Sequence, residues 1–331
     1  MVGDRLLRAA RRGRRMTRVA SIDCGTNSIR LLVADVPADG AHTDLLRRME
    51  VVRLGQGVDA TGRLAPEAIE RTRTVLVEYA AQARNLGATA VRMVATSATR
   101  DAANRSDFED MVVAVLGQGP DVVDGTEEAE LSFIGATASL DTAAAAHGVV
   151  PPRPPFLVVD IGGGSTEFVL GDTHGVRAAR SVDVGCVRLT ERHLHGDPPS
   201  AEQVRRTEDD IRDALARVVA DVPVAEAATL IGVAGSVTTV AAIALDLPEY
   251  DPVAIHGSSI EVKAVREVTA YLLAATRERR AAMPVMHPGR VDVIGAGALI
   301  LRVLMDEFGL SEVVVSEHDI LDGIALGLAR G

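Results

Sequence analysis

Two segments of the chain place an aspartate, a glycine-containing turn and a hydroxyl side chain between two apolar stretches. The first, residues 19–33, carries Asp23, and the second, residues 157–170, carries Asp160. Glycine lets the backbone of such a turn approach a ligand, so that consecutive N–H groups can bind an anion while the carboxylate holds a cation. One copy is typical of an ordinary β-hairpin. Two matched copies predict two similar domains whose turns face one cleft, with phosphate and a metal ion as occupants.

A third turn of this kind contains Gly235 and Ser236. It lies between a predicted strand, residues 229–233, and a predicted helix whose first N–H groups and dipole could bind an anion. Taken alone, such a turn is more typical of a plain connection between a strand and a helix.

The elements around these turns alternate between strand and helix. Apolar residues recur at helical spacing over residues 66–86, where Pro66 begins the helix and Gly87 ends it. The loop at 124–126 precedes an alanine-rich helix that extends toward residue 140, with Thr126 as its predicted N-cap. The first half also contains a predicted strand at 89–95, a helix from 104 to 116 and a short strand at 122–123.

The second half repeats this scheme after a proline-rich connection at 148–155. Gly295 and Gly297 lie in a segment where small residues favour close packing against another helix. Alternation of this kind predicts an α/β fold. The predicted elements are strands at 181–184, 229–233 and 312–316 and helices at 200–221 and 320–328.

The composition of the chain predicts a cytoplasmic protein with two cores. Its 331 residues are 47% hydrophobic and only 2% aromatic, so alanine, valine and leucine must fill those cores. No apolar run approaches the roughly 18 residues of a membrane span, which argues against a membrane protein. Cys24 and Cys186 are the only cysteines, and they imply no disulfide framework.

The charge of the chain is acidic, with a net charge of −11, and this argues against nucleic acid as a general partner. Residues 1–16 carry six arginines and lack the apolar segment of a secretory signal. We interpret them as a disordered basic arm or an over-long gene model in which Met16 is the true start. Because Lys263 is the only lysine, arginines must supply any basic strip that holds a phosphate ligand.

Several blocks, taken in order, resemble the exopolyphosphatase / guanosine pentaphosphate phosphohydrolase family. Each block is weak by itself, but the ordered set is specific and extends from about residue 17 to the end. The resemblance implies two ribonuclease-H-like domains of the actin, sugar-kinase and heat-shock ATPase superfamily around an active-site cleft. The blocks are Asp23-x-Gly25-Thr-Asn27-Ser28, Thr96-x-x-x-Arg100, Gly125-x-Glu127-Glu128-Ala, Asp160-Ile-Gly162-Gly163-Gly164-Ser165-Thr-Glu167, Val184-Gly-Cys186-Val and Gly232-x-Ala-Gly235-Ser236.

By this resemblance, Glu128 is the base that activates a water molecule in line with the terminal phosphorus. Two glutamates in the first turn of a helix otherwise favour a simple interaction with the helix dipole, and Glu127 keeps that interpretation. Arg100 matches a family arginine that could neutralise charge on the transferred phosphoryl group, with a surface salt bridge as the alternative.

The resemblance also implies a Mg²⁺ site, with Mn²⁺ as a possible substitute. Asp160 and Glu167 match the family's metal-associated carboxylates, and Asp23 is a third candidate. The other polar groups of the blocks would bind phosphate. The predicted phosphate-binding residues are Gly25, Asn27, Ser28, Gly162, Gly163, Gly164, Ser165, Gly235 and Ser236.

The resemblance predicts the division of the chain. Residues 17–138 form the N-terminal and residues 139–316 the C-terminal ribonuclease-H-like domain, while the last helix, 317–331, could pack back on the first domain. The closing segment departs from the family pattern at His318 and Leu321, and the family's arginine is missing there. This departure favours short polyphosphate chains over long ones.

The predicted activity is that of an exopolyphosphatase, which releases orthophosphate from the end of inorganic polyphosphate. Hydrolysis of guanosine pentaphosphate is the alternative, because both ligands offer a terminal phosphoanhydride, and guanosine penta- and tetraphosphate are thus possible partners. A kinase or ATPase of the same superfamily and a non-catalytic sensor are weaker alternatives. The resemblance also predicts a homodimer.

Overall fold

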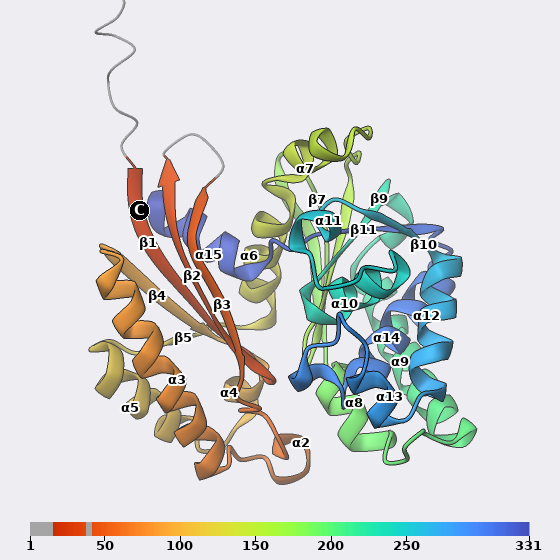
Figure 1. Cartoon of the computed structure of the whole chain (residues 1–331), viewed down its shortest axis with the longest axis horizontal. Coiled ribbons are helices and arrows are strands. Elements are labelled where there is room, and N and C mark those ends of the chain that lie inside the picture. Colours follow the sequence, from red (N-terminus) through yellow and green to blue (C-terminus); the bar gives the residue numbers. More distant parts are fainter. Residues whose placement is uncertain (1–15, 38–41, 331) are drawn as a thin grey trace, which may run out of the picture.

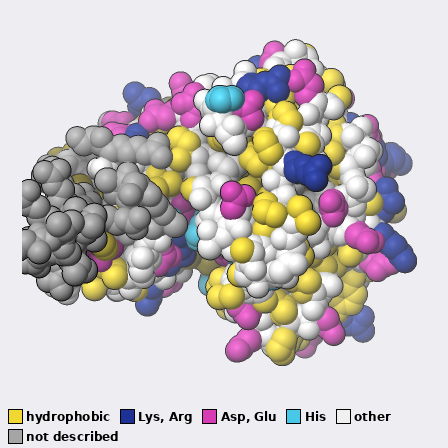
Figure 2. Space-filling view, turned by 90° about the horizontal axis from the view of Figure 1, so that it is seen from above, with side chains coloured by type: hydrophobic (Ala, Val, Ile, Leu, Met, Phe, Trp, Pro, Cys, Tyr) yellow, Lys and Arg dark blue, Asp and Glu magenta, His cyan; other side chains and the backbone are white. Residues whose placement is uncertain are grey.

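The computed structural model describes residues 16–37 and 42–330, so that residues 1–15 of the predicted basic arm lie outside the described residues. The described chain forms two halves side by side, each built on one β-sheet with helices on its faces (Figure 1). On the face seen in Figure 2, acidic and basic side chains are interspersed rather than gathered into one basic patch. Among the described helices, none is long and apolar enough to cross a membrane.

The first sheet has the strand order β3-β2-β1-β4-β5. Strands β1 and β2 form the hairpin of the first glycine turn, β3 extends it in the antiparallel sense, and β4 and β5 run parallel to β1. Its strands are β1 (Met16–Cys24), β2 (Ser28–Pro37), β3 (Thr43–Val51), β4 (Ala90–Ala95) and β5 (Asp121–Val122).

The second sheet has the order β10-β11-β9-β6-β7-β8. Read from β8, it repeats the order of the first sheet and adds β10 at the edge, and the β6–β7 hairpin takes the place of β1–β2. The duplication predicted from the two turns is therefore confirmed at the level of topology. Its strands are β6 (Phe156–Ile161), β7 (Thr166–Asp172), β8 (Gly175–Val182), β9 (Thr229–Val233), β10 (Ser259–Glu261) and β11 (Glu312–Val315).

Helices cover both sheets and enclose two main cores. The larger core joins the second sheet to α8, α9, α10, α12 and α14, and the smaller joins the first sheet to α3 and α5. The helices are α2 (Val58–Thr61), α3 (Pro66–Asn85), α4 (Ser97–Asp101), α5 (Arg105–Leu116), α6 (Gly125–Thr137), α7 (Leu140–His147), α8 (Cys186–His193), α9 (Ala201–Asp221), α10 (Ala234–Ala244), α11 (Pro252–Ile255), α12 (Val262–Ala274), α13 (Arg277–Ala281), α14 (Ile294–Glu307) and α15 (Ile320–Arg330), with 3₁₀ turns η1 (Val224–Glu226) and η2 (Pro288–Arg290).

Local signals explain most of these boundaries. The predicted helices at 66–86 and 200–221 are confirmed as α3 and α9, and α9 begins with a capping box between Ser200 and Gln203. The predicted N-cap of α6 is wrong. Asp124, not Thr126, caps this helix, because its carboxylate accepts hydrogen bonds from the N–H groups of Thr126 and Glu127, both at 2.9 Å. The predicted strand at 181–184 is also shifted, since β8 already ends at Val182.

Helices α6 and α15 each pack against the sheet of the opposite half. In the sequence, α6 follows the strands of the first sheet, and α15 follows those of the second. Helix α6 packs against the second sheet, whereas α15, at the C-terminal end of the chain, packs against β1 and β2 of the first (Figure 1). The two helices cross in close contact, since a Cβ atom at Gly135 would lie 1.8 Å from the carbonyl oxygen of Asp319. A Cβ atom at Gly323 would likewise lie 2.0 Å from the carbonyl oxygen of Leu131. This crossing joins the two halves and fixes the position of α6.

We expect Gly323→Ala to lower the free energy of unfolding by about 2 kcal/mol or more, because the new methyl group would push the backbone of α6 away from α15. Gly327→Ala, on the same helix, is the matched control, since a Cβ atom there meets nothing within 4 Å. Its effect should be neutral or stabilising by up to about 1 kcal/mol. Urea unfolding measures both, and equal stabilities for the two variants would contradict the close crossing.

Candidate active site

A cleft lies where the two glycine turns meet, and it encloses about 780 Å³ with its open mouth included. Residues of both sheets and of helices α6 and α10 line it. The structure therefore brings together most of the predicted site residues from distant parts of the sequence. Those that line the cleft are Asp23, Gly25, Asn27, Ser28, Glu128, Asp160, Gly162, Gly163, Ser165, Gly235 and Ser236.

Three predicted site residues lie beside the cleft without lining it. Glu167 is buried on β7 opposite Asp160, where its carboxylate accepts a hydrogen bond from Ser181 at 2.7 Å. Arg100 donates to the Glu128 carboxylate at 3.2 Å and is not among the residues that line the cleft. Gly164 faces the other half of the molecule.

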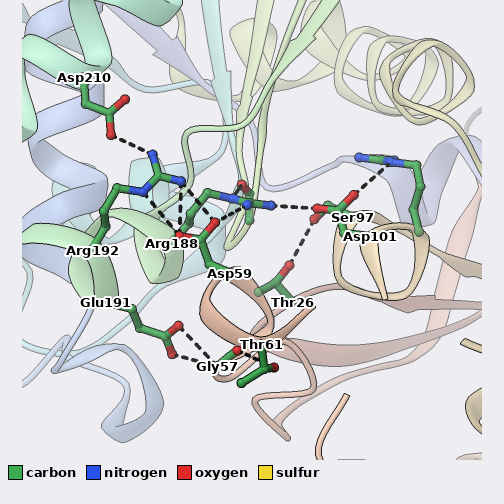
Figure 3. Close-up of polar contacts among 12 residues, drawn as sticks. Thr26, Gly57, Asp59, Thr61, Ser97, Asp101, Arg188, Glu191, Arg192 and Asp210 are labelled. Atoms are coloured by element: carbon green, nitrogen blue, oxygen red, sulfur yellow. Dashed lines mark hydrogen bonds and ion pairs between the residues drawn. The ribbon is translucent and has the colours of Figure 1, made fainter. Parts of the chain in front are cut away.

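The two turns of the repeated motif pack against each other. A Cβ atom at Gly164 would lie 2.6 Å from the hydroxyl oxygens of both Ser97 and Thr26, and one at Gly163 would lie 2.9 Å from Cβ of Thr26. These two hydroxyls are themselves 3.0 Å apart and hydrogen bonded (Figure 3). Only glycine fits here, because the second turn contacts both the first turn and the start of α4.

Each of the two turns contains the same internal hydrogen bond. The N–H of Gly25 donates to the carbonyl of Ser28, and the N–H of Gly162 donates to the carbonyl of Ser165, each at 3.0 Å. These two N–H groups are therefore already hydrogen bonded and are not free to donate to a phosphate. Gly25 and Gly162 can aid phosphate binding only because they lack a side chain and let the ligand approach the backbone.

Helix α8 orients the peptide groups of the second turn. Its first N–H groups, from Cys186 and Val187, donate at 2.9 Å to the carbonyls of Gly162 and Gly163. A Cβ atom at Gly185 would lie 2.4 Å from the carbonyl oxygen of Gly163, so glycine permits this approach. With these carbonyls held by α8, the next N–H groups of the turn donate to no other backbone group in the described chain, which is the arrangement that an anion-binding nest requires.

Buried carboxylates concentrate negative charge in the cleft. Burial raises the pKa of Asp160 to about 6, and the nearby negative charge of Asp319 adds to this shift. Burial and the charge of Asp160 raise the pKa of Glu167 to about 7. Burial and the charge of Glu167 raise the pKa of Glu128 well above its usual value. Such mutual repulsion favours a bound cation or protonation of one member.

Two arginines that sequence reasoning missed face this negative charge. Arg30, two positions after Ser28 on the same face of β2, binds the Asp23 carboxylate at 2.7 and 2.9 Å and also pairs with Asp319. Strand alternation after the motif could have revealed it. No sequence signal marks Arg290, whose guanidinium occupies the space that a side chain at Gly235 would need.

A second pocket continues from the cleft and shares Arg30 and Arg290 with it. Arg47 and Arg48 of β3 also line this pocket, together with Leu321. Leu321 stands where the family has an arginine, and these two arginines, from another part of the chain, line the same pocket as Leu321. Arg30 and Arg47 are already paired with carboxylates, so a basic strip that holds a phosphate ligand stays a prediction.

His318 does not reach the cleft but joins a cluster at the start of α15. Its ligand atoms and those of His42 and Asp322 lie within 4.8 Å of one another, as in a metal site. However, the guanidinium of Arg47 binds the Asp322 carboxylate at 2.5 Å, and His42 lies 2.9 Å from that carboxylate and 3.1 Å from that of Asp44. These ion pairs already balance the charges, so we interpret the cluster as a structural network.

The cluster should make stability depend on pH. Burial opposes the charge of His42, but Asp322 and Asp44 outweigh it and raise the pKa from 6.5 to about 9. Because the folded pKa is raised, the stabilisation is complete below pH 6.5 and is lost as the pH rises through 9. We therefore expect His42→Gln to cost on the order of 3 kcal/mol at pH 6 and much less at pH 9.5.

Urea unfolding at the two pH values measures this difference. His174→Gln changes an exposed histidine and serves as the control, which should leave the free energy of unfolding nearly unchanged. An equal effect of His42→Gln at both pH values would show that His42 is not held in its charged form.

The fold and the cleft together define the class of protein. Two sheets of the same strand order, with glycine turns and buried carboxylates at a shared cleft, form the two-domain architecture of the actin, sugar-kinase and heat-shock ATPase superfamily. Within this class, the chain belongs to the Ppx/GppA phosphatase family, whose model matches residues 32–330.

Individual relatives support this assignment. The chain is 51% identical to exopolyphosphatase 2 of Mycobacterium tuberculosis over 95% of this chain and 99% of the relative. A solved exopolyphosphatase-like protein superimposes with a TM-score of 0.89 at 40% identity, covering 95% of this chain and 99% of the other. The Ppx/GppA enzyme of Aquifex aeolicus gives a TM-score of 0.77 at 31% identity, covering 94% and 99%.

Proposed function

We propose that this protein is an exopolyphosphatase that hydrolyses the terminal phosphoanhydride bond of inorganic polyphosphate and releases orthophosphate. The observation that carries the proposal is the position of Glu128, a buried carboxylate that lines a cleft between two anion-binding turns. The 51% identity to a protein named exopolyphosphatase 2 supports the same substrate.

The terminal phosphate would be held between the two turns. Donors from the second turn are the N–H groups after Gly162 and the hydroxyl of Ser165, and donors from the first are Asn27 and Ser28. Ser236, in the first turn of α10, adds a hydroxyl beside the positive end of a helix dipole. Ala234 begins this helix with a φ of 68°, a conformation that residues with a side chain adopt rarely and that often accompanies a functional site.

The carboxylates fit a hard divalent cation, and we propose Mg²⁺, with Mn²⁺ as a substitute. One oxygen of the buried Asp23 carboxylate, Oδ1, has no hydrogen-bond partner among the described residues, and Asp160 lines the same cleft. Asp160 and Asp23 would hold the ion from the cleft. Glu167, which does not line the cleft, would hold it from its position opposite Asp160 on β7. When bound, such an ion supplies positive charge to the phosphate oxygens.

In the proposed reaction, Glu128 accepts a proton from the water that attacks the terminal phosphorus. Its raised pKa makes it a better proton acceptor than an exposed glutamate. Arg100 holds one carboxylate oxygen of Glu128 and so orients the other toward the cleft. Because Arg100 does not line the cleft, we assign it this positioning role in place of direct contact with the transferred group.

We expect Glu128→Gln to reduce phosphate release from polyphosphate at least about 100-fold, because glutamine keeps the shape of the side chain but cannot take up the proton. The matched control is Glu127→Gln. Glu127 lies one position away in the same helical turn, with its side chain 48% exposed and paired with Arg92 at the surface. This control should stay within about twofold of the wild type. Orthophosphate release in the presence of Mg²⁺ measures both, and activity retained by Glu128→Gln would show that Glu128 is not the base.

Guanosine pentaphosphate is the second candidate substrate, and the pocket beside the cleft favours it. Tyr250, Val285 and Met286 line that pocket together with the arginines. Polyphosphate has no apolar group that could pack against this surface, whereas a nucleoside has one. A nucleoside could occupy this surface while its terminal phosphate reaches the turns.

The two substrates are separated by comparing phosphate release from short polyphosphate, long polyphosphate and guanosine pentaphosphate at equal concentration of terminal phosphate. We expect short polyphosphate to be preferred, because Leu321 stands where the family has arginine. A clear preference for the nucleotide would favour the second candidate, and retained ligand binding without phosphate release would favour a sensor. The homodimer and the cytoplasmic location remain predictions.

A further inference from the structure

One arginine of α8 binds the second glycine turn and the opposite half of the molecule at the same time. Nε of Arg188 donates to the carbonyl of Gly164 at 2.7 Å, and its two terminal nitrogens donate to the carboxylates of Asp59 and Asp101, the latter at 2.7 Å (Figure 3). Asp59 belongs to α2 and Asp101 to α4, which both lie on the side of the first sheet. The planar guanidinium thus uses three donors on three separate segments.

These contacts differ from an ordinary surface salt bridge, which contributes little. The side chain of Arg188 is only 14% exposed, and the carboxylates of Asp59 and Asp101 are 25% and 31% exposed. A further contact crosses the halves on the same side, since Glu191 of α8 accepts from the N–H of Gly57 at 3.2 and 3.3 Å. Arginine is suited to this position because its fork is rigid and can satisfy several acceptors in fixed geometry.

The contacts of Arg188 lead directly to the site. The carbonyl of Gly164 is the last of the three that α8 holds, so Arg188 completes the orientation of the turn that binds the anion. On the other side, Asp101 follows Arg100 in α4, and Arg100 holds Glu128. A single side chain therefore connects the phosphate-binding turn of one half to the helix that orients the base.

We propose that Arg188 is a positioning residue that couples closure of the two halves to the alignment of the phosphate-binding turn and of Glu128. The inference rests on the proposed hydrolysis of polyphosphate. With Arg188 in place, closure sets the turn and α4 together. Without it, the halves can approach while the turn and the base remain misaligned.

The proposal is tested by the kinetics of Arg188→Ala and Arg188→Lys. We expect kcat to fall about tenfold or more in Arg188→Ala, since small misalignments of the reacting groups are costly. Lysine should not rescue the rate, because one ammonium group cannot replace the fork. Guanidinium ion, added at low millimolar concentration, should restore part of the rate of Arg188→Ala, which a merely structural role would not produce.

Arg192→Ala is the matched control. Arg192 lies one helical turn further along α8 and also pairs with Asp59, but its other partner is Asp210 and it does not touch the turn. Its kcat should remain within about twofold of the wild type. Equal losses in Arg188→Ala and Arg192→Ala, with no guanidinium rescue, would overturn the positioning role, and thermal unfolding of every variant identifies any that fails to fold.

The double variant Asp59→Asn with Asp101→Asn removes the carboxylates that Arg188 binds across the halves, together with the one that Arg192 binds, and it keeps the bond from Arg188 to Gly164. We expect KM for polyphosphate to rise about threefold to tenfold, with a smaller fall in kcat than in Arg188→Ala. Small-angle X-ray scattering without substrate should give a larger radius of gyration than for the wild type. An unchanged scattering profile would overturn the closure role, whichever phosphoanhydride is the substrate. Failure of the wild type to act on polyphosphate would overturn only the proposed function.

Discussion

The contact between the two glycine turns is the constraint on which the rest of the structure depends. Gly163 and Gly164 leave no room for a side chain against Thr26 and Ser97, so the two halves meet where each carries its glycine turn. Neither turn forms a complete site by itself, because the donors of one and the buried aspartate of the other face a shared space. The crossing of α6 and α15 then brings Glu128 to the same place.

The charge distribution follows from this contact. The carboxylates of the site are buried, and this burial raises the pKa values of Asp160 and Glu167; the charge of Asp319 adds to the shift of Asp160, and the charge of Asp160 adds to that of Glu167. Arg30 offsets part of this charge by binding Asp23 and Asp319 at once. A bound cation would offset more of it, so the net charge of −11 does not by itself keep a phosphate ligand out of the cleft.

The sequence predicted the repeated unit and most of the candidate site, but not the contacts that orient it. The alternation of apolar residues around Asp23 and Asp160 is local, so both hairpins could be predicted from the chain alone. Arg188 and Arg290 stood in no motif that predicted a role, because their partners are far away in the sequence. Arg100 was predicted as a catalytic residue, but its hydrogen bond to Glu128 joins α4 to α6, two segments that local sequence does not place side by side.

The sequence by itself determined the two hairpins, the α/β alternation and the types of residue that we propose for phosphate and metal binding, because these depend on local spacing and side-chain chemistry. Only the tertiary structure decided that the second turn has its carbonyls held by α8, that α6 and α15 exchange sides, and that His318 joins an ion-pair network away from the cleft. Each of these results depends on which groups, distant in the sequence, fill the same space and on how deeply their charges are buried there. The residues next to each group in the sequence do not specify either factor.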